Sequence, residues 1–159
     1  MNTTITATET IYLSKKGMKD LKKDVQQLER DRHKTIRELH DQDKTDNHDE
    51  RLARIEKLAQ LDSIESELAD KQALLSAAKL YPRKRDAVMV AIGSVVELID
   101  NTGRKVVYTV VDSIEANPSD GRISAKSPLG QNLIGKTISD TISWGKDLRK
   151  SQFQLVKIS

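Results

Sequence analysis

Apolar residues recur with a helical period over the first half of the chain, from Ser14 to about Leu80. Most are spaced by three, four or seven positions, which places them on one face of a helix, where they form a seam for a partner helix. No proline interrupts the pattern, and Ser14 is a suitable N-cap. The stripe positions are Leu21, Val25, Leu28, Thr35, Ile36 and Leu39, followed by Ile55, Leu58, Leu61, Ile64, Leu68 and Leu75.

The two apolar stripes are separated by residues 41–50, which contain no apolar side chain. Asp, Asn and Thr favour turns over helix interiors. The pattern therefore predicts an antiparallel coiled-coil hairpin over residues 13–80 with a turn at 41–50. Each arm has about 30 residues, or roughly 45 Å at 1.5 Å per residue.

The second half of the chain has a different pattern, with short runs typical of β-strands and turn signals between them. Pro82 disfavours helix at the residue before it, so residues 81–86 are expected to be a linker. We expect an α+β protein, in which the helical hairpin is followed by a small, mostly antiparallel β-sheet domain over 87–159, and residues 1–12 are a flexible N-terminus. The predicted strands are 87–92, 94–99, 105–111, 122–125, 137–144 and 152–158, with a short helix at 128–135.

Composition excludes several classes of protein. The chain has no cysteine, so disulfides, thiol catalysis and Cys-based zinc sites are absent. No apolar run approaches the roughly 20 residues of a membrane span, and the Thr-rich start does not resemble a signal peptide. We therefore expect a cytoplasmic protein. The net charge of +3 hides a balanced N-terminal half and a mildly basic C-terminal half, and neither resembles the concentrated basic stripe of a free-standing DNA binder.

The turn at 41–50 carries five acids and one lysine. One interpretation is an ordinary solvated loop. The other is a tip that recruits Mg²⁺, since a protein often supplies one or two carboxylates while phosphates and water complete the coordination. Such a tip is too small to enclose an ion, but it can complete a site built by another protein, in which a second ion assists phosphoryl displacement.

Other chemistries fit the turn less well. An EF-hand counted from Asp41 requires Gly and Glu where Asp46 and Leu52 stand. His40 and His48 flank the acids but lack a third ligand for a transition metal. The Gly-x-Ser-x-Gly motif, which presents the serine nucleophile of α/β-hydrolases, is also absent. The sequence therefore does not indicate an enzyme in its own right.

Three segments resemble the GreA/GreB family of transcription elongation factors. Residues 13–21, Leu-Ser-Lys-Lys-Gly-Met-Lys-Asp-Leu, resemble its opening signature, and residues 43–49, Asp-Lys-Thr-Asp-Asn-His-Asp, its tip motif. The most specific segment is 127–136, Ser-Pro-Leu-Gly-Gln-Asn-Leu-Ile-Gly-Lys, followed by Asp140. It is similar to the family's Ser-Pro-Leu-x-x-x-Leu-Leu/Ile-Gly-Lys-x-x-x-Asp stretch. The resemblance covers nearly the whole chain from Leu13.

The resemblance implies a fold and a mechanism. The second domain is expected to be FKBP-like and to dock on bacterial RNA polymerase, while the hairpin enters the secondary channel and stimulates cleavage of backtracked RNA at its 3′ end. The factor has no cofactor of its own and acts as a monomer that shares Mg²⁺ with the polymerase. The resemblance assigns Mg²⁺ binding to Asp43 and Asp46, support at the tip to Asp41, Asn47 and Asp49, and docking on the polymerase to Ser127, Pro128, Leu133 and Gly135.

The tip departs from the family pattern in ways that leave two functions open. Asp46 replaces the usual Glu, which shortens the side chain by one methylene; Gln42 stands in place of Gly, and Glu50 in place of an aromatic residue. Both arms of the hairpin are also shorter than those of the family, by about one helical turn each. The chain is therefore either a cleavage factor or a regulator that occupies the channel without stimulating cleavage. The basic residues of the first helix, including Arg30, Lys34 and Arg37, are either solvated or in contact with RNA phosphates.

Overall fold

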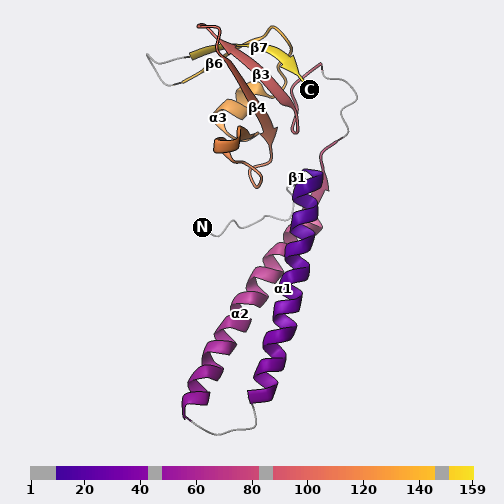
Figure 1. Ribbon diagram of the computed structural model, residues 1–159. Helices are drawn as coiled ribbons and strands as arrows, with labels where there is room; N and C mark the ends of the chain where they lie inside the picture. The colour runs from indigo at the N-terminus through magenta and orange to yellow at the C-terminus, as the bar shows by residue number, and fades with distance from the viewer. Residues whose placement is uncertain (1–9, 43–47, 83–87, 146–150) are drawn as a thin grey trace. The chain divides into compact units, whose positions relative to one another are not determined.

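The computed structural model describes residues 10–42, 48–82, 88–145 and 151–159. Among these residues the chain forms two compact units. Residues 15–78 form a helical hairpin, and residues 10–14 together with 79–159 form a second unit built around a β-sheet (Figure 1). The predicted fold class, a helical hairpin followed by a β-sheet domain, is confirmed.

The hairpin consists of α1 (Lys15–Asp41) and α2 (His48–Ala77). Its seam is built by the predicted stripe, since Leu21, Val25 and Leu39 of α1 and Leu68 of α2 are buried. Thr35 is also buried, and its hydroxyl donates a hydrogen bond of 2.9 Å to the carbonyl of Asp31 in the preceding turn. This bond satisfies the one polar group that the α1 stripe brings into the seam.

Ion pairs tie the two helices together in antiparallel register. Lys71 lies 2.9 Å from Asp24, Arg32 lies 2.8 Å from Glu65, and Lys57 pairs with Glu38. The residue numbers of the partners on α2 therefore decrease as those on α1 increase, as expected for antiparallel helices. The hydrogen bond from Lys57 is the main reason why the pKa of Glu38 is lowered. Because these pairs are partly exposed to solvent, each contributes little to stability and mainly fixes the register.

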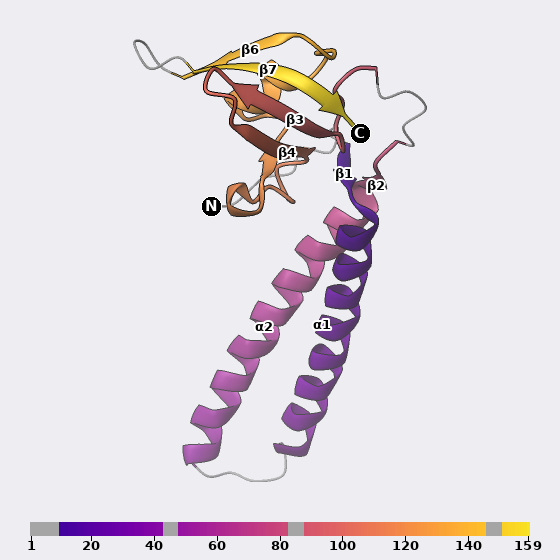
Figure 2. The ribbon, with the colours of Figure 1, turned by 45° about the horizontal axis from the view of Figure 1, so that its top comes forward.

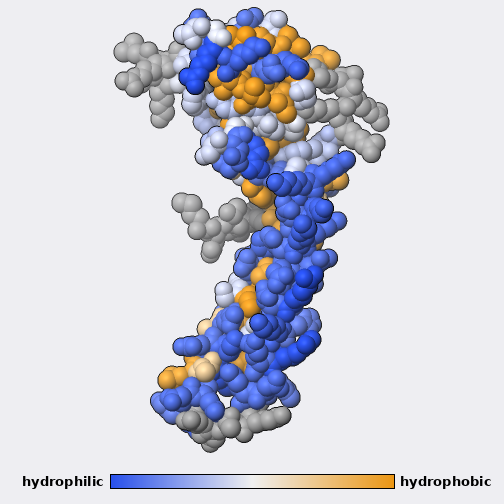
Figure 3. All heavy atoms as spheres, viewed as in Figure 1, coloured by the Kyte–Doolittle hydropathy of each residue, from blue (hydrophilic) through white to orange (hydrophobic). Residues whose placement is uncertain are grey.

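The apolar seam is narrower than the sequence predicted. Ile36, Ile55 and Leu58 were expected in it, but they are exposed to solvent, as is Leu52. Leu52, Ile55 and Leu58 lie on the first three turns of α2, so the part of this helix next to the tip leaves apolar side chains in contact with solvent. In Figure 3 the hairpin surface is mostly hydrophilic, with an apolar area close to its tip end.

Two short strands were not predicted. α2 ends at Ala77 rather than near Leu80, and β2 (Ala78–Leu80) follows it. β2 pairs with β1 (Ile11–Leu13), so Ile11 and Tyr12 are ordered in a strand although the sequence suggested a flexible segment there. Ile11 and Leu13 are buried, which explains why this part of the chain is held in place.

The second unit contains a five-stranded sheet in the order β5-β4-β3-β7-β6. Figure 2 shows β4, β3, β7 and β6 side by side in this order. All neighbouring strands are antiparallel except β4 and β5, which pair in parallel. The elements of this unit are β3 (Val95–Asp100), β4 (Lys105–Val111), a 3₁₀ turn η2 (Pro118–Asp120), β5 (Arg122–Ser124), α3 (Pro128–Leu133), β6 (Thr141–Trp144) and β7 (Ser151–Ile158).

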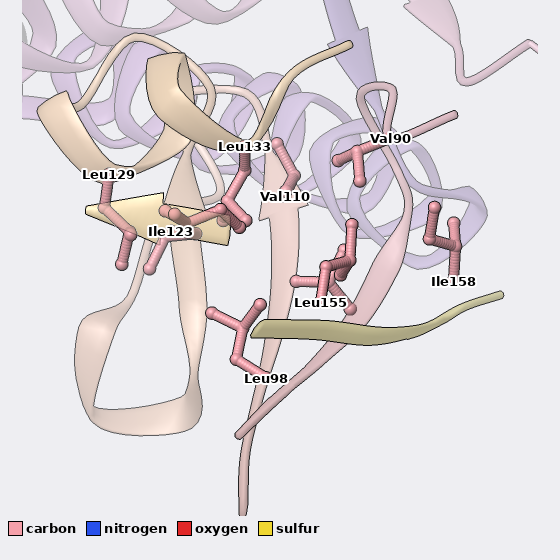
Figure 4. Close-up of a cluster of buried hydrophobic side chains, with 10 residues drawn as sticks. Val90, Leu98, Val110, Ile123, Leu129, Leu133, Leu155 and Ile158 are labelled. Carbon is pink, nitrogen blue, oxygen red and sulfur yellow. The ribbon is translucent and has the colours of Figure 1, made fainter. Parts of the chain in front are cut away.

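The hydrophobic core of the second unit lies between the sheet and α3. Leu129 and Leu133 of α3 point toward side chains of the sheet such as Leu98, Val110 and Leu155 (Figure 4). Complete burial of an aliphatic side chain is worth about 1.5–3 kcal/mol, so this cluster is the main source of stability in the unit. Its members are Val90, Val96, Leu98, Val110, Ile123, Leu129, Leu133, Ile142, Leu155 and Ile158.

Four of the six predicted strands are found with bounds that differ by at most one residue: 94–99 is β3, 105–111 is β4, 122–125 is β5 and 152–158 is β7. The strand predicted at 137–144 begins only at Thr141. Its first four residues form a turn, in which the N–H and hydroxyl of Thr137 donate to the carboxylate of Asp140 at 2.8 and 3.0 Å.

The strand predicted at 87–92 is wrong for the described residues 88–92. Only Met89 forms a bridge, to Thr137, and the backbone of Val90 bonds to residues 135 and 136. The chain then turns at Gly93, which has φ of +88°. The apolar run therefore supplies Val90 to the core without continuing as a strand.

Candidate functional site

The acidic tip lies at the junction of α1 and α2. Asp41 is the last residue of α1, and Asp49 and Glu50 lie in the first turn of α2. The turn predicted over residues 41–50 is therefore shorter than expected, because both of its ends are helical. Carboxylates near a helix N-terminus are stabilised by the helix dipole, which favours the start of α2 at this position.

The residues expected to bind Mg²⁺ and to support it, Asp43, Asp46 and Asn47, lie outside the described residues. Of the described tip residues, Asp41 has a side chain that is 79% exposed, with its Oδ1 3.9 Å from Nδ1 of His40. An exposed carboxylate of this kind is open to a partner or an ion. No three His, Asp or Glu side chains in the described part of the chain are grouped as a metal site would require.

Glu50 is an acid to which the sequence analysis gave no role. Oε2 of Glu50 is buried and has no hydrogen-bond partner among the described residues, and the same holds for Oε1 of Gln42. A buried carboxylate oxygen without a partner is costly. The acidity of residue 50 was visible in the sequence, but the burial of this oxygen was not.

The α1 face that leads to the tip carries both basic and acidic side chains. Arg30, Lys34 and Arg37 lie three or four residues apart and line a shallow hollow of about 520 Å³ together with His33. Glu29, Glu38 and Asp41 line the same hollow, and Nζ of Lys34 lies 3.9 Å from Oε1 of Glu38. Side chains at this spacing follow one face of a helix, so three cations and three carboxylates line the same side of α1.

The most specific sequence segment, residues 127–136, folds around the short helix α3. Ser127 is its N-cap: its hydroxyl accepts the N–H of Gly130 at 3.0 Å and donates to the carbonyl of Ser124 at 2.6 Å. Pro128 occupies the first turn, where its missing N–H is not needed. A Cβ at Gly130 would lie 2.0 Å from the oxygen of Ser124, so only glycine fits.

This segment presents some of its residues to solvent and buries others. Pro128 and Gly135 are exposed, whereas Leu133 is fully buried in the core. Leu133 therefore shapes the segment from inside, and its side chain is not available to a partner. Gly135 has φ of +81°, and its N–H donates to the carbonyl of Val90 at 2.8 Å.

Three exposed apolar side chains lie in the segment or beside it, and two of them, Ile138 and Met89, were not singled out by the sequence. Ile134 is 40% exposed, Ile138 is 50% exposed, and Met89 is 54% exposed and forms a bridge to Thr137. The position of Met89 beside this segment could not be predicted from the sequence, because its bridge joins residues that are nearly 50 positions apart. Together with Pro128 they make the surroundings of α3 suitable for contact with another protein.

No helix among the described residues is both long enough and apolar enough to cross a membrane.

Comparison with protein families identifies residues 85–159 as a match to the family described as "Transcription elongation factor, GreA/GreB, C-term". Among curated proteins, the chain is 33% identical over 138 residues to "Transcription elongation factor GreA" of Mycoplasma genitalium, covering 81% of this chain and 83% of that protein. It is 31% identical over 148 residues to the protein of the same name from a Nitratiruptor species, covering 89% and 88%.

Among solved structures, the crystal structure of the GreA factor homolog 1 protein of Thermus thermophilus aligns with 95% of this chain and 99% of its own. The sequence identity is 25% and the TM-score is 0.41.

Proposed function

This chain belongs to the GreA/GreB family of transcription elongation factors, and we propose that it binds bacterial RNA polymerase, enters the secondary channel and stimulates cleavage of backtracked nascent RNA. Within this proposal it is an accessory factor, not an enzyme, since the cleavage activity belongs to the polymerase. It acts in the cytoplasm as a monomer.

The observation that best supports this function is the division of the chain into a slender hairpin and a compact sheet unit. α1 has 27 residues and is therefore about 40 Å long. A hairpin of two helices can enter a narrow channel that excludes a globular domain. The sheet unit, with Pro128 and Ile134 exposed beside α3, is the part that docks outside.

The tip supplies the chemistry in this proposal. Asp43 and Asp46 would hold a second Mg²⁺ jointly with the polymerase, and Asp41, Asn47 and Asp49 would support them. A second metal ion stabilises the attacking water and the leaving oxygen of an in-line displacement at phosphorus. The contribution of the chain itself is to bring carboxylates to the ion and to orient the water.

The cations on this face of α1 fit the same proposal. Arg30, Lys34 and Arg37 line a hollow that runs toward the tip. A backtracked RNA 3′ segment carries one phosphate per nucleotide, and cations at this spacing neutralise successive phosphates. This contact would hold the RNA while the tip acts.

The test is RNA cleavage in stalled, backtracked complexes with the cognate polymerase. Asp43→Asn combined with Asp46→Asn is expected to abolish the stimulation of cleavage. The matched control is Asp62→Asn combined with Asp70→Asn, which removes the same charge from exposed positions of α2 far from the tip. Cleavage by the tip variant at the wild-type rate would refute the proposed role of the two acids.

A second candidate function is a channel-binding regulator that does not stimulate cleavage. It is favoured by Asp46, whose side chain is one methylene shorter than the glutamate usual in the family. A ligand misplaced by about 1 Å can cost about a hundredfold in rate. Slower elongation without added cleavage, caused by the wild-type protein, would establish this function instead.

A further inference from the structure

Two carboxylates from the turn after β4 accept backbone N–H groups of β1 and of Ser14, the residue that follows it. The N–H of Tyr12 donates to Oδ2 of Asp112 at 3.2 Å, and the N–H of Ser14 donates to Oε2 of Glu115 at 3.0 Å. Alternate residues of a strand direct their N–H groups to the same side. On the other side of β1, the carbonyl of Leu13 accepts the N–H of Tyr81 at 3.1 Å. Asp112 and Glu115 thus stand where a neighbouring strand would be.

Glu115 also joins two segments that are distant in the sequence. Its Oε1 accepts the hydroxyl of Ser14 at 2.7 Å, and its Oε2 accepts the hydroxyl of Tyr81 at 2.6 Å. With the backbone N–H of Ser14, one carboxylate therefore accepts three hydrogen bonds. A charged acceptor makes such bonds stronger than neutral ones.

The ring of Tyr81 is held at its other end by a glycine. Gly93 has φ of +88°, and a Cβ built there would lie 3.1 Å from Cδ2 of Tyr81. The ring therefore packs closely on the backbone at Gly93 while its hydroxyl reaches Glu115. This arrangement fixes the orientation of the side chain.

Protonation states suit the network at neutral pH. Burial raises the pKa of Glu115, but the hydrogen bonds from Ser14 and Tyr81 outweigh it and leave the pKa below its ordinary value. Burial, followed by the hydrogen bond to Glu115, raises the pKa of Tyr81. Glu115 is thus a charged acceptor and Tyr81 a protonated donor.

The network lies where the chain enters and leaves the hairpin. Ser14 is the last residue of the sheet unit before α1, and the chain returns to that unit at Lys79, two residues before Tyr81. Glu115 is bonded to both connecting segments. We propose that Glu115 is a positioning residue, which holds these two segments together and thereby fixes where the hairpin tip is delivered; this inference rests on the proposed function.

The length of the hairpin makes its base sensitive. For an arm of about 40 Å, a rotation of about 5° at the base displaces the tip by about 3.5 Å. Because a displacement of about 1 Å can cost about a hundredfold in rate, loosening the base affects chemistry at the far end. Docking of the sheet unit does not depend on this angle.

The first experiment measures the position of the hairpin in the free full-length protein. The chain has no cysteine, so nitroxide labels can be placed at Gln60→Cys on α2 and Asn101→Cys in the sheet unit and their distance distribution measured by pulsed electron paramagnetic resonance. Glu115→Ala is expected to broaden or shift the distribution. Glu97→Ala, the control, removes a carboxylate from β3 of the same unit and is expected to leave it unchanged.

Two further variants separate positioning from folding. Tyr81→Phe removes one hydroxyl and keeps the ring on Gly93, and it is expected to broaden the distribution less than Glu115→Ala. Glu115→Gln keeps a neutral acceptor and is expected to restore most of the wild-type distribution. The same distribution in the wild type, Glu115→Ala and Tyr81→Phe would overturn the proposal.

The second experiment measures cleavage of backtracked RNA as a function of factor concentration. Glu115→Ala is expected to lower the rate at saturation by about tenfold or more, with an unchanged half-saturating concentration, and Glu115→Gln is expected to recover most of the rate. A rise in the half-saturating concentration alone would refute the positioning role. If the wild-type protein stimulates no cleavage, the proposed function fails, and the distance measurement still decides the role of Glu115 by itself.

Discussion

Gly130 is the position where adding a single methyl group should most disturb the sheet unit. In the structure a Cβ at this residue would lie 2.0 Å from the carbonyl oxygen of Ser124 and 2.9 Å from Cα of Ala125. Both atoms belong to the backbone, so the overlap cannot be relieved by a change of rotamer. Gly130→Ala must instead move α3 away from the end of β5.

The cost of this movement can be worked out from the contacts that it breaks. The carbonyl of Ser124 accepts two hydrogen bonds from Ser127, one from its hydroxyl at 2.6 Å and one from its N–H at 3.0 Å. Each is worth about 1 kcal/mol, and forcing an extra carbon into a packed site typically adds about 1–3 kcal/mol. We expect Gly130→Ala to lower the free energy of unfolding of the sheet unit by about 3–5 kcal/mol.

Urea unfolding monitored by tryptophan fluorescence measures this effect in the sheet unit, because Trp144 on β6 is the only tryptophan of the chain. Circular dichroism at the helical band follows the hairpin separately. The control is Gln131→Ala, an exposed residue on the same helix. A change below about 0.5 kcal/mol for Gly130→Ala, the size typical of surface substitutions, would show that the close packing of α3 on β5 is incorrect.

Three other predictions follow from the same structure. Leu68→Ala should destabilise the hairpin by about 2–4 kcal/mol, because Leu68 is buried in the seam. Ile55→Ala should change stability by less than about 0.5 kcal/mol, because Ile55 is exposed. Thermal unfolding followed by helical circular dichroism compares the two variants, and equal effects would contradict the seam. Ser127→Ala should cost about 1 kcal/mol through loss of the N-cap, measured by tryptophan fluorescence in urea, and no loss would exclude the cap. The pKa of Glu115 is lowered on folding, so the stabilising effect of this carboxylate is present above its unfolded pKa of about 4.3 and is lost as the pH falls through the folded value. Glu115→Ala should therefore flatten the decline in the free energy of unfolding as the pH is lowered. An unaltered decline would show that the protonation of Glu115 does not cause it.

The parts of the fold that the sequence predicted are those with a long repeated pattern. Leu21, Val25 and Leu68 recur at helical spacing over many turns, which indicates two paired helices. The stripe was less reliable near the tip, where Ile55 and Leu58 keep the spacing but face solvent. Spacing alone does not determine which of two apolar faces meets the partner helix.

The short strands β1 and β2 were missed for a different reason. A strand of three residues is too short to show alternation, and β1 is held by contacts with Asp112 and Glu115, which are 100 and 101 residues away from their partners. Pairings at this separation leave no local signal. The positioning role proposed for Glu115 was for the same reason invisible in the sequence.

In the candidate site, too, the residues with a local sequence pattern were predicted and those placed by long-range packing were not. Ser127 and Pro128 have the local signature of a helix start, and both take that role in α3. The exposure of Met89 beside this segment depends on packing across the sheet unit and had no signal. Asp43 and Asp46 stay a prediction from their position at the turn.

The central claim, delivery of the tip to the polymerase active centre, is tested most directly by a crosslink. Because the chain has no cysteine, Lys44→Cys between the two tip acids provides a single attachment point for a photoreactive group. In backtracked complexes the account predicts a crosslink to the RNA 3′ end or to the catalytic residues of the polymerase, and none from the same group at Asn101→Cys in the sheet unit. A tip that reacts only with the outer surface of the polymerase, or not at all, would contradict the account.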